Sequence, residues 1–315
     1  MRSPACSNGR ERVAGVLVVA GPTASGKTAL ALELALRFDA EIVGADSRQI
    51  YRGMEIGTAS PTAEELARVP HHLVGFLSPH ERYSAARFAR EAAAAVEAIA
   101  ARGRRAIVVG GTGFYIRALC GDVSLSSAYD PQLRARLARE AALHPPEVLH
   151  EWLRARDPRR AAEVAAGDRY RVVRALEIAL SDASAASGAG SGEAAGLRAA
   201  GIPFVKVVLD VEQAALDAAI AARVDRMLAR GLVEEAERVG LDAVAADAVG
   251  YPDAIAFARG WSSPEELRSS LVRRTRRYAK RQRTWFRSEP AVTWVEKDAA
   301  LETVSRLARE LPGWG

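Results

Sequence analysis

Residues 16–28 read VLVVAGPTASGKT, an apolar run followed by an octapeptide that starts with glycine and ends in Gly-Lys-Thr. The apolar run, residues 16–20, is rich in β-branched side chains and predicts a buried parallel strand. Residues 21–28 match the pattern G-x-x-x-x-G-K-[ST], and the amphipathic stretch 29–38 predicts a helix. A strand, a glycine-rich turn and a helix in this order predict a phosphate-binding loop.

The chemistry of this loop follows from its residue types. Glycines permit backbone conformations that a β-carbon would block, so successive N–H groups can converge on an oxyanion at the start of a helix. Lys27 adds a full positive charge, and the hydroxyl of Thr28 can bind Mg²⁺. We therefore assign binding of a diphosphate or nucleotide to Gly21, Pro22, Thr23, Ala24, Ser25, Gly26, Lys27 and Thr28.

Further strands and helices alternate along the chain. Apolar runs at residues 41–45, 106–109 and 204–209 predict strands, and an alanine-rich stretch at 84–102 predicts a helix with Ser84 as its N-cap. This order predicts an α/β fold, a doubly wound and mainly parallel sheet with right-handed crossovers. No internal repeat is visible.

The middle of the chain predicts an insertion. Residues 130–180 are helical in pattern and rich in arginine and alanine, and residues 181–192 read SDASAASGAGSG, which is typical of a linker. We expect a first part of the α/β core at 1–125, a helical insertion at 126–186 and a second part of the core with basic C-terminal helices at 187–315.

Composition excludes several classes of protein. The 315 residues are 49% hydrophobic and 26% charged, as in soluble globular proteins, and no apolar run is long enough to span a membrane. Residues 1–15 lack the apolar core of a secretory signal, so we expect a cytoplasmic protein. The two cysteines, Cys6 and Cys120, form no CxxC pair, which argues against a disulfide framework or a four-cysteine zinc site.

Positive charge is concentrated near the C-terminus. Residues 273–287 read RRTRRYAKRQRTWFR, with eight basic residues and no acid, although the whole chain carries a net charge of only +5. Such a patch favours a polyanionic partner, and the alternative is a solvated helix face.

The phosphate-binding loop alone does not name a reaction. NTPases with this loop usually carry a second apolar strand that ends in a magnesium-binding aspartate. The strand at 106–109 ends instead in Gly-Gly-Thr-Gly, and the strand that ends in Asp210 lies far along the chain. Asp46 follows the second strand and is a candidate general base at the ligand-binding edge of the sheet. From this segment alone, an N-cap of the next helix is the favoured role.

Six motifs taken together resemble one family, the tRNA dimethylallyltransferases, also called tRNA isopentenyltransferases. The motifs are GPTASGKT at 21–28, DSRQIYRGMEIGTASP at 46–61, HHL at 71–73, GGTGFYIRAL at 110–119, DRYRVVRALEI at 168–178 and AKRQRTWFR at 279–287. They extend over nearly the whole chain.

The resemblance implies a reaction and its partners. The dimethylallyl group of dimethylallyl diphosphate would move to the exocyclic N6 amine of adenosine-37, beside the anticodon of tRNAs that read codons beginning with U. The enzyme would use Mg²⁺, and nothing in the sequence requires more than a monomer. A nucleotide kinase or NTPase acting on RNA is the alternative, and a non-catalytic RNA-binding protein is a third hypothesis.

The resemblance also implies roles for particular residues. Asp46 would be the general base, and Thr28 and Arg223 would act on the diphosphate. Without the resemblance, Arg223 would be a surface arginine. Arg171 and Arg174 would form a solvated face or act as ion-pair partners, and Trp285 and Phe286 could equally well be core anchors. The implied tRNA contacts are Asp46, Ser47, Arg48, Gln49, Thr112, Arg134, Tyr170, Arg171, Val172, Val173, Arg174, Lys280, Arg281, Gln282, Arg283, Thr284, Trp285, Phe286 and Arg287.

Two segments depart from the family pattern. Where the family carries R-x-x-G-Y-K/R, residues 247–252 read DAVGYP, which keep the glycine and tyrosine but neither basic residue. The Thr-Gly-x-Pro signal that usually follows the motif at 168–178 is replaced by the Ser/Ala/Gly-rich stretch. Adjacent histidines in an extended segment point to opposite sides, so His71 and His72 are expected to be structural, and no zinc site is predicted.

Overall fold

The computed structural model describes residues 14–123, 130–185 and 196–315. The expectations for residues 1–13, including Cys6, and for linker residues 186–192 lie outside the described residues. The chain divides into two compact units, one formed by residues 1–123 and 195–315 and the other by residues 124–194. Each unit is described separately below.

The first unit is built on a parallel sheet, which confirms the predicted α/β fold. The sheet has six strands in the order β3-β2-β4-β1-β5-β6, and every pair of neighbours is parallel. The phosphate-binding sequence therefore follows a central strand. The strands are β1 (Val16–Ala20), β2 (Ala40–Gly44), β3 (His71–His72), β4 (Arg105–Gly110), β5 (Phe204–Asp210) and β6 (Val292–Glu296).

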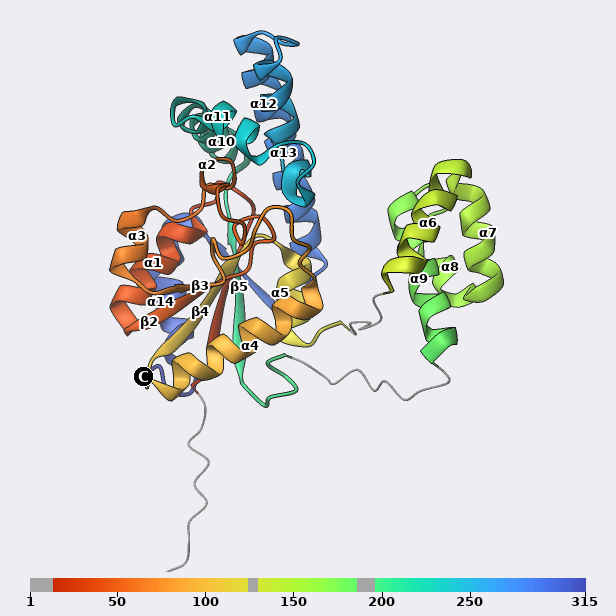
Figure 1. The fold of residues 1–315 in the computed structure, drawn as a ribbon. Coiled ribbons are helices and arrows are strands. Elements are labelled where there is room, and N and C mark those ends of the chain that lie inside the picture. The colour runs from red at the N-terminus through yellow and green to blue at the C-terminus, as the bar shows by residue number, and fades with distance from the viewer. Residues whose placement is uncertain (1–13, 124–129, 186–195) are drawn as a thin grey trace, which may run out of the picture. The chain divides into compact units, whose positions relative to one another are not determined.

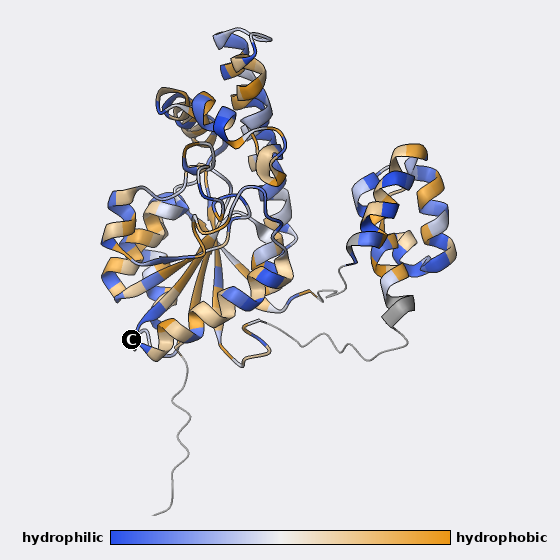
Figure 2. Cartoon of the chain, viewed as in Figure 1, coloured by the Kyte–Doolittle hydropathy of each residue, from blue (hydrophilic) through white to orange (hydrophobic). Residues whose placement is uncertain are grey.

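Helices cover both faces of this sheet (Figure 1), which explains why β1 is apolar throughout. One face packs against α1 (Lys27–Phe38) and α14 (Ala300–Arg309), and the other packs against α4 (Ala85–Ala101) and α5 (Gly113–Cys120). Figure 2 shows the strands as an apolar layer between helices of mixed hydropathy. Ser84 caps α4 as predicted, because its side chain accepts from the N–H of Arg87.

A third apolar cluster lies beyond the carboxyl ends of the strands, where further helices gather (Figure 1). It joins the segment after β2 to helices from the C-terminal third of the chain. This layer forms one wall of the candidate site. Its elements are α2 (Glu55–Thr58), α10 (Gln213–Ala229), α11 (Leu232–Val239), η1 (Val244–Asp247), α12 (Tyr251–Ala258) and α13 (Pro264–Arg287), and the unit also contains α3 (Ala63–Arg68) and η2 (Lys297–Ala299).

The second unit is helical, with α6 (Pro131–Leu143), α7 (Pro146–Arg156), α8 (Pro158–Glu163) and α9 (Arg169–Ala185). Leu149, Leu153 and Val172 are fully buried in its core. Helix α9 continues through residues 181–185, so the prediction that these five residues belong to a linker is wrong. Alanine and serine tolerate a helix, and here the helix extends over them. Among the described helices, none combines the length and the apolar character needed to cross a membrane.

The strand order corrects one sequence-based argument. Asp210 seemed remote from the phosphate-binding loop because it lies far along the chain, but β5 is the direct neighbour of β1. The carboxylate of Asp210 pairs with Arg283 at 2.9 Å. A strand order of this kind brings together segments that are about 190 residues apart in sequence, since parallel neighbours need not be consecutive.

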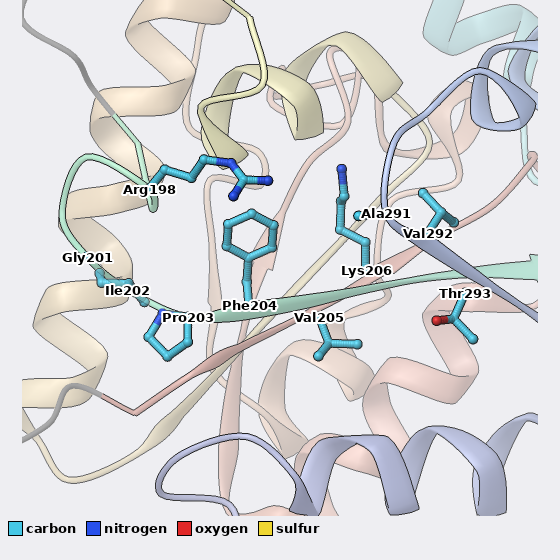
Figure 3. A pocket seen from close by; sticks show the side chains of 10 residues that line it. All are labelled: Arg198, Gly201, Ile202, Pro203, Phe204, Val205, Lys206, Ala291, Val292 and Thr293. Carbon is cyan, nitrogen blue, oxygen red and sulfur yellow. The ribbon is translucent and has the colours of Figure 1, made fainter.

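A hollow of about 840 Å³ lies at the other end of the sheet, beside the first residues of β5 and β6 (Figure 3). Arg198 lies over the ring of Phe204, and the amine of Lys206 is bonded to Asp122 (2.8 Å) and Glu289 (3.0 Å). The charges at this end are thus paired within the protein. In a parallel sheet this is the end opposite the phosphate-binding loop.

Candidate active site

The turn from β1 into α1 forms an anion cradle. Gly26 adopts a φ of 92°, which strains any residue with a β-carbon, and α1 begins at the next residue. Within the described structure, the hydroxyl oxygen of Ser25 is buried and has no hydrogen-bond partner. Because buried polar atoms are nearly always paired, this oxygen fits a ligand group seated in the loop. Thr28 lies in the first turn of α1, where the helix dipole also favours an anion.

Lys27 is the cation of the cradle. Its ammonium donates to the carbonyl of Pro22 at 3.2 Å. Burial lowers the pKa of Lys27 to about 8, Asp46 opposes this shift, and Arg223 adds to it. A second lysine was missed by sequence reasoning: Lys297, which precedes α14, places its Cε 3.6 Å from where a β-carbon on Gly26 would lie.

Asp46 lies two residues beyond β2, at the edge of the sheet where the cradle lies. Its Oδ1 accepts from the backbone N–H groups of Arg48 (2.9 Å) and Gln49 (3.4 Å). Residues 47–50 form a turn, and the next helix begins only at Glu55 with Met54 as its N-cap, so the expected helix N-cap is wrong and Asp46 caps a turn instead. Its other oxygen, Oδ2, accepts no hydrogen bond from the described part of the chain. One oxygen fixes the carboxylate and the other is available for chemistry.

A cavity of about 310 Å³ joins these groups. Thr23 of the loop, Asp46 and Arg223 all line it, although they lie far apart in sequence. The guanidinium of Arg223 donates to the carbonyl of Thr58 at 3.0 Å. Burial lowers the pKa of Arg223, and the nearby Asp46 opposes this. The volume lies at the lower end of the range typical of small-molecule sites.

Helix α13 closes the site through a glutamine. Gln282 is buried, its Oε1 accepts from the N–H of Thr23 (2.8 Å) and its Nε2 donates to the carbonyl of Gly111 (2.9 Å). A β-carbon on Gly111 would lie 2.3 Å from Gln282, and one on Gly113 would lie 2.1 Å from Trp285. These glycines therefore let α13 approach the loop after β4.

The same loop also supports the segment that carries Asp46. The hydroxyl of Thr112 accepts from the N–H of Ser47 at 3.0 Å and contacts the Ser47 hydroxyl at 3.3 Å. Tyr278 of α13 lines the cavity, and burial together with Asp46 raises its pKa. Its place there was not predicted, although its spacing of four residues from Gln282 puts both on one helix face.

The two residues that follow Ser47 are already engaged within the protein. Arg48 forms an ion pair with Asp247 at 2.9 Å, so the segment that departs from the family pattern contacts a predicted tRNA-binding residue. The side-chain amide of Gln49 donates to the carbonyls of Thr58 (3.2 Å) and Ala59 (3.0 Å). Both residues lie beside the base candidate.

The basic stretch forms a stripe along α13. Arg277, Lys280 and Arg287 are exposed, and their spacing puts them on one helix face together with Arg273 and Thr284. Arg281 lies over the ring of Tyr278 at 5.6 Å and lines the cavity, whereas Arg283 is paired with Asp210. This stripe is the surface of α13 that is open to a polyanion.

Burial of the side chain argues against three of the predicted tRNA contacts. Phe286 is 1% exposed in the core beside the sheet, and Val172 is fully buried in the helical unit. The side-chain amide of Gln282 is buried and hydrogen-bonded to Thr23 and Gly111. Their side chains anchor helices and cannot reach an RNA. Trp285 is half-buried between Arg117 (4.5 Å to its ring) and Phe114, with its indole nitrogen unpaired among the described residues.

Two of the predicted contacts in the helical unit, Arg134 and Arg174, lie beside the same buried acid, Glu177. Arg174 pairs with Glu177 at 2.7 Å, and Arg134 lies 3.9 Å from the same carboxylate. Arg171 pairs with Asp168 at 3.4 Å. Tyr170 is 74% exposed, and Val173 is partly buried against the core of this unit.

The two histidines lie on β3. His72 bonds the buried Glu41 at 2.6 Å, and His71 bonds the carbonyl of Val69 at 2.7 Å. Each is thereby given a structural partner. No cluster of three or more His, Cys, Asp and Glu residues suited to a metal ion occurs in the described ranges.

Comparisons with known proteins agree on one family. The family described as IPP transferase matches residues 49–289. A tRNA dimethylallyltransferase of Geobacter sulfurreducens is 41% identical over 305 residues, which cover 95% of this chain and 97% of that protein. One of Anaeromyxobacter dehalogenans is 46% identical over 295 residues, which cover 92% of this chain and 98% of that protein.

Solved structures give the same result. The tRNA isopentenylpyrophosphate transferase of Bacillus halodurans superposes with a TM-score of 0.66 at 35% identity, covering 94% of this chain and 95% of that one. A eukaryotic dimethylallyltransferase acting on tRNA shares the fold with a TM-score of 0.74 at 23% identity, covering 93% of this chain and 77% of that one.

The pKa of Lys27 leads to a prediction on ligand binding. Since this pKa is about 8, the ammonium loses its proton and its charge as the pH rises through 8. The last pKa of an alkyl diphosphate is about 6, so its charge does not change in this range. Its affinity for the protein should therefore fall by up to about tenfold per pH unit above 8. Calorimetric titration between pH 7 and 9.5 measures this. In Lys27→Arg the guanidinium stays charged, so the fall should vanish whatever the affinity. A flat wild-type profile would remove Lys27 from this role.

Proposed function

Since this chain belongs to the IPP transferase family, we propose that it transfers the dimethylallyl group of dimethylallyl diphosphate to a tRNA and releases diphosphate. The acceptor is the N6 amine of adenosine-37 in tRNAs that read codons beginning with U. The observation that carries this proposal is the shared cavity. Asp46, the buried Arg223 and Thr23 of the phosphate-binding loop line the same space.

The reaction needs a base on one side and an anion site on the other. The lone pair of an exocyclic adenine amine is delocalised into the ring, so N6 must lose a proton as it bonds to C1 of the dimethylallyl group. Asp46 accepts that proton on Oδ2, while Oδ1 stays bonded to the backbone. The C1–O bond breaks, and its electron pair leaves with the diphosphate. Lys27, Arg223 and the loop amides stabilise this growing charge.

The residues of the cradle fit a magnesium ion that arrives with the diphosphate. Mg²⁺ prefers oxygen ligands and often binds through few protein groups, substrate phosphates and water. Thr28 would supply its hydroxyl, and the described residues offer no acidic cluster for a separate site. When bound, the ion would neutralise part of the charge on the leaving diphosphate.

The RNA would dock along the basic stripe of α13. A base within the anticodon loop must leave its stack to reach a pocket, and Tyr278 and Arg281 border the space that would receive it. We propose that the protein acts as a monomer in the cytoplasm. The alternative, phosphoryl transfer or hydrolysis of a nucleotide, is favoured only by the nearness of Asp210 to the loop, and that carboxylate is paired with Arg283.

One assay separates these functions. Unmodified tRNA, Mg²⁺ and labelled dimethylallyl diphosphate are incubated with the protein, and label is followed into the RNA. Label at adenosine-37 supports the proposal. Turnover of ATP without label in the RNA would replace it with the phosphoryl-transfer alternative, and salt-sensitive binding without either reaction would leave an RNA-binding protein.

Removal of the base should abolish transfer but not docking. Asp46→Asn keeps the size of the side chain and loses the proton acceptor, so the single-turnover rate should fall by about 10²- to 10⁴-fold with tRNA affinity nearly unchanged. Asp225→Asn is the matched control, because Asp225 lies on α10 and pairs with the exposed Arg268. Near-normal turnover by Asp46→Asn would exclude Asp46 as the base.

Neutralising the stripe should weaken binding in a salt-dependent manner. Each phosphate contact contributes about 0.7 to 0.9 to the slope of log affinity against log salt, so the double variant Arg277→Gln/Lys280→Gln should lower that slope by about 1 to 2. Filter binding of tRNA at several salt concentrations measures this. The double variant Arg306→Gln/Arg309→Gln on α14 should leave the slope unchanged. An equal slope in both would show that α13 is not the docking surface.

The ion pair between Arg48 and Asp247 should oppose RNA binding. Asp247→Asn frees Arg48 for the RNA, and since an exposed pair is worth up to about 1 kcal/mol, tRNA affinity should rise up to about fivefold. Asp242→Asn removes an exposed charge from the same region without touching Arg48 and isolates the general effect of charge. An equal gain in both variants would contradict a specific role of this pair.

A further inference from the structure

Gly250 and Tyr251 keep the family pattern, but the sequence suggested no role for them. In the structure, Tyr251 belongs to a network of hydrogen bonds behind the site. Gly250 has a φ of 103°, and Tyr251, the first residue of α12, is fully buried. The Tyr251 hydroxyl lies 2.7 Å from Oε1 of Glu235 and 3.2 Å from the carbonyl of Met54, and its proton can be donated to either. Burial and Glu235 raise the pKa of Tyr251, which keeps this hydroxyl protonated.

Glu235 of α11 is a buried carboxylate that faces no cation in the described structure. It is 1% exposed, and its two oxygens accept from the N–H groups of Ile56 (2.8 Å) and Gly57 (2.7 Å). With the tyrosine hydroxyl, three donors converge on it. A carboxyl group offers acceptor oxygens to all three, whereas a glutamine would turn its NH₂ toward at least one donor.

The two amides belong to α2, whose other end faces the cavity. The carbonyl of Thr58, the last residue of α2, accepts from Arg223 (3.0 Å) and from Gln49 (3.2 Å). The ring of Tyr251 packs against this short helix so closely that a β-carbon on Gly57 would lie 2.6 Å from it. Helix α2 is thus fixed at one end by Glu235 and presents a carbonyl to Arg223 at the other.

We propose that Glu235 and Tyr251 are positioning residues that hold α2 so that the Thr58 carbonyl aims the guanidinium of Arg223 at the diphosphate. The inference rests on the proposed function for the identity of the ligand. A four-residue helix has too few internal hydrogen bonds to keep its own place, so its orientation depends on these outside contacts. Neither residue lines the cavity. Their effect on the ligand must therefore pass through α2 and Arg223.

A double-mutant cycle tests this with inorganic diphosphate as the probe, by calorimetry. Glu235→Gln should lower the affinity about tenfold, and Tyr251→Phe, which keeps the ring and loses one hydroxyl, about threefold. In an Arg223→Ala background, both changes should have almost no further effect, because the residue they position is gone. Losses of equal size with and without Arg223, or no loss in the wild-type background, would overturn the proposal.

Two further measurements separate this from general destabilisation and from the proposed function. Glu289→Gln removes an equally buried carboxylate that pairs with Arg117 and Lys206 at the far end of the unit. It should lower the melting temperature and leave diphosphate affinity unchanged, and a loss of affinity there would also count against the proposal. Because the probe needs no tRNA, failure of the wild-type protein to label tRNA would remove the proposed function while the coupling to Arg223 is still measured.

Discussion

The tight turn at Gly26, between a buried central strand and a helix, is the constraint on which the rest of the site depends. At the start of this helix a buried serine hydroxyl has no partner in the described structure, which supports the proposed anion site in the loop. A loop of this kind has few contacts of its own to keep it rigid. Gln282 fixes it through hydrogen bonds to Thr23 on one side and to Gly111 on the other. The helix that carries the basic stripe is therefore also the helix that fixes the loop.

Burial and charge–charge interactions together set the pKa values of the charged groups around the loop. Lys27 and Arg223 are cations whose pKa values are lowered by burial, and Asp46 compensates part of that cost for both. Lys27, Arg223 and Asp46 together carry a net positive charge beside the loop, which suits the proposed diphosphate. The carboxylate is oriented by the backbone of the turn that follows it. One oxygen of Asp46 caps the turn, and the proposed role as a base falls to the other oxygen, so the two roles do not compete.

The layer of helices beyond the sheet acts on the site from outside. Arg223 bonds a backbone carbonyl, that carbonyl belongs to α2, and α2 is held by Glu235 and Tyr251. Arg48 is likewise held by Asp247 from the same layer. The segment 247–252, which departs from the family pattern, thus takes part in the site by two routes. Its tyrosine bonds Glu235 behind the proposed diphosphate site, and its aspartate pairs with Arg48, a predicted tRNA contact.

The sequence alone determined the sheet, the anion loop and the helical insertion, because each depends on a local pattern of apolar and glycine residues. Short local motifs also identified Asp46 as a candidate base and the basic stretch as a candidate binding surface. Only the tertiary structure decided which residues meet. Phe286 and Gln282 share a basic motif with exposed arginines, and helix packing alone turned them inward. Asp210 came next to the loop because strand order is not chain order. Glu235 has no local signal at all, since its two backbone donors come from a segment about 180 residues away.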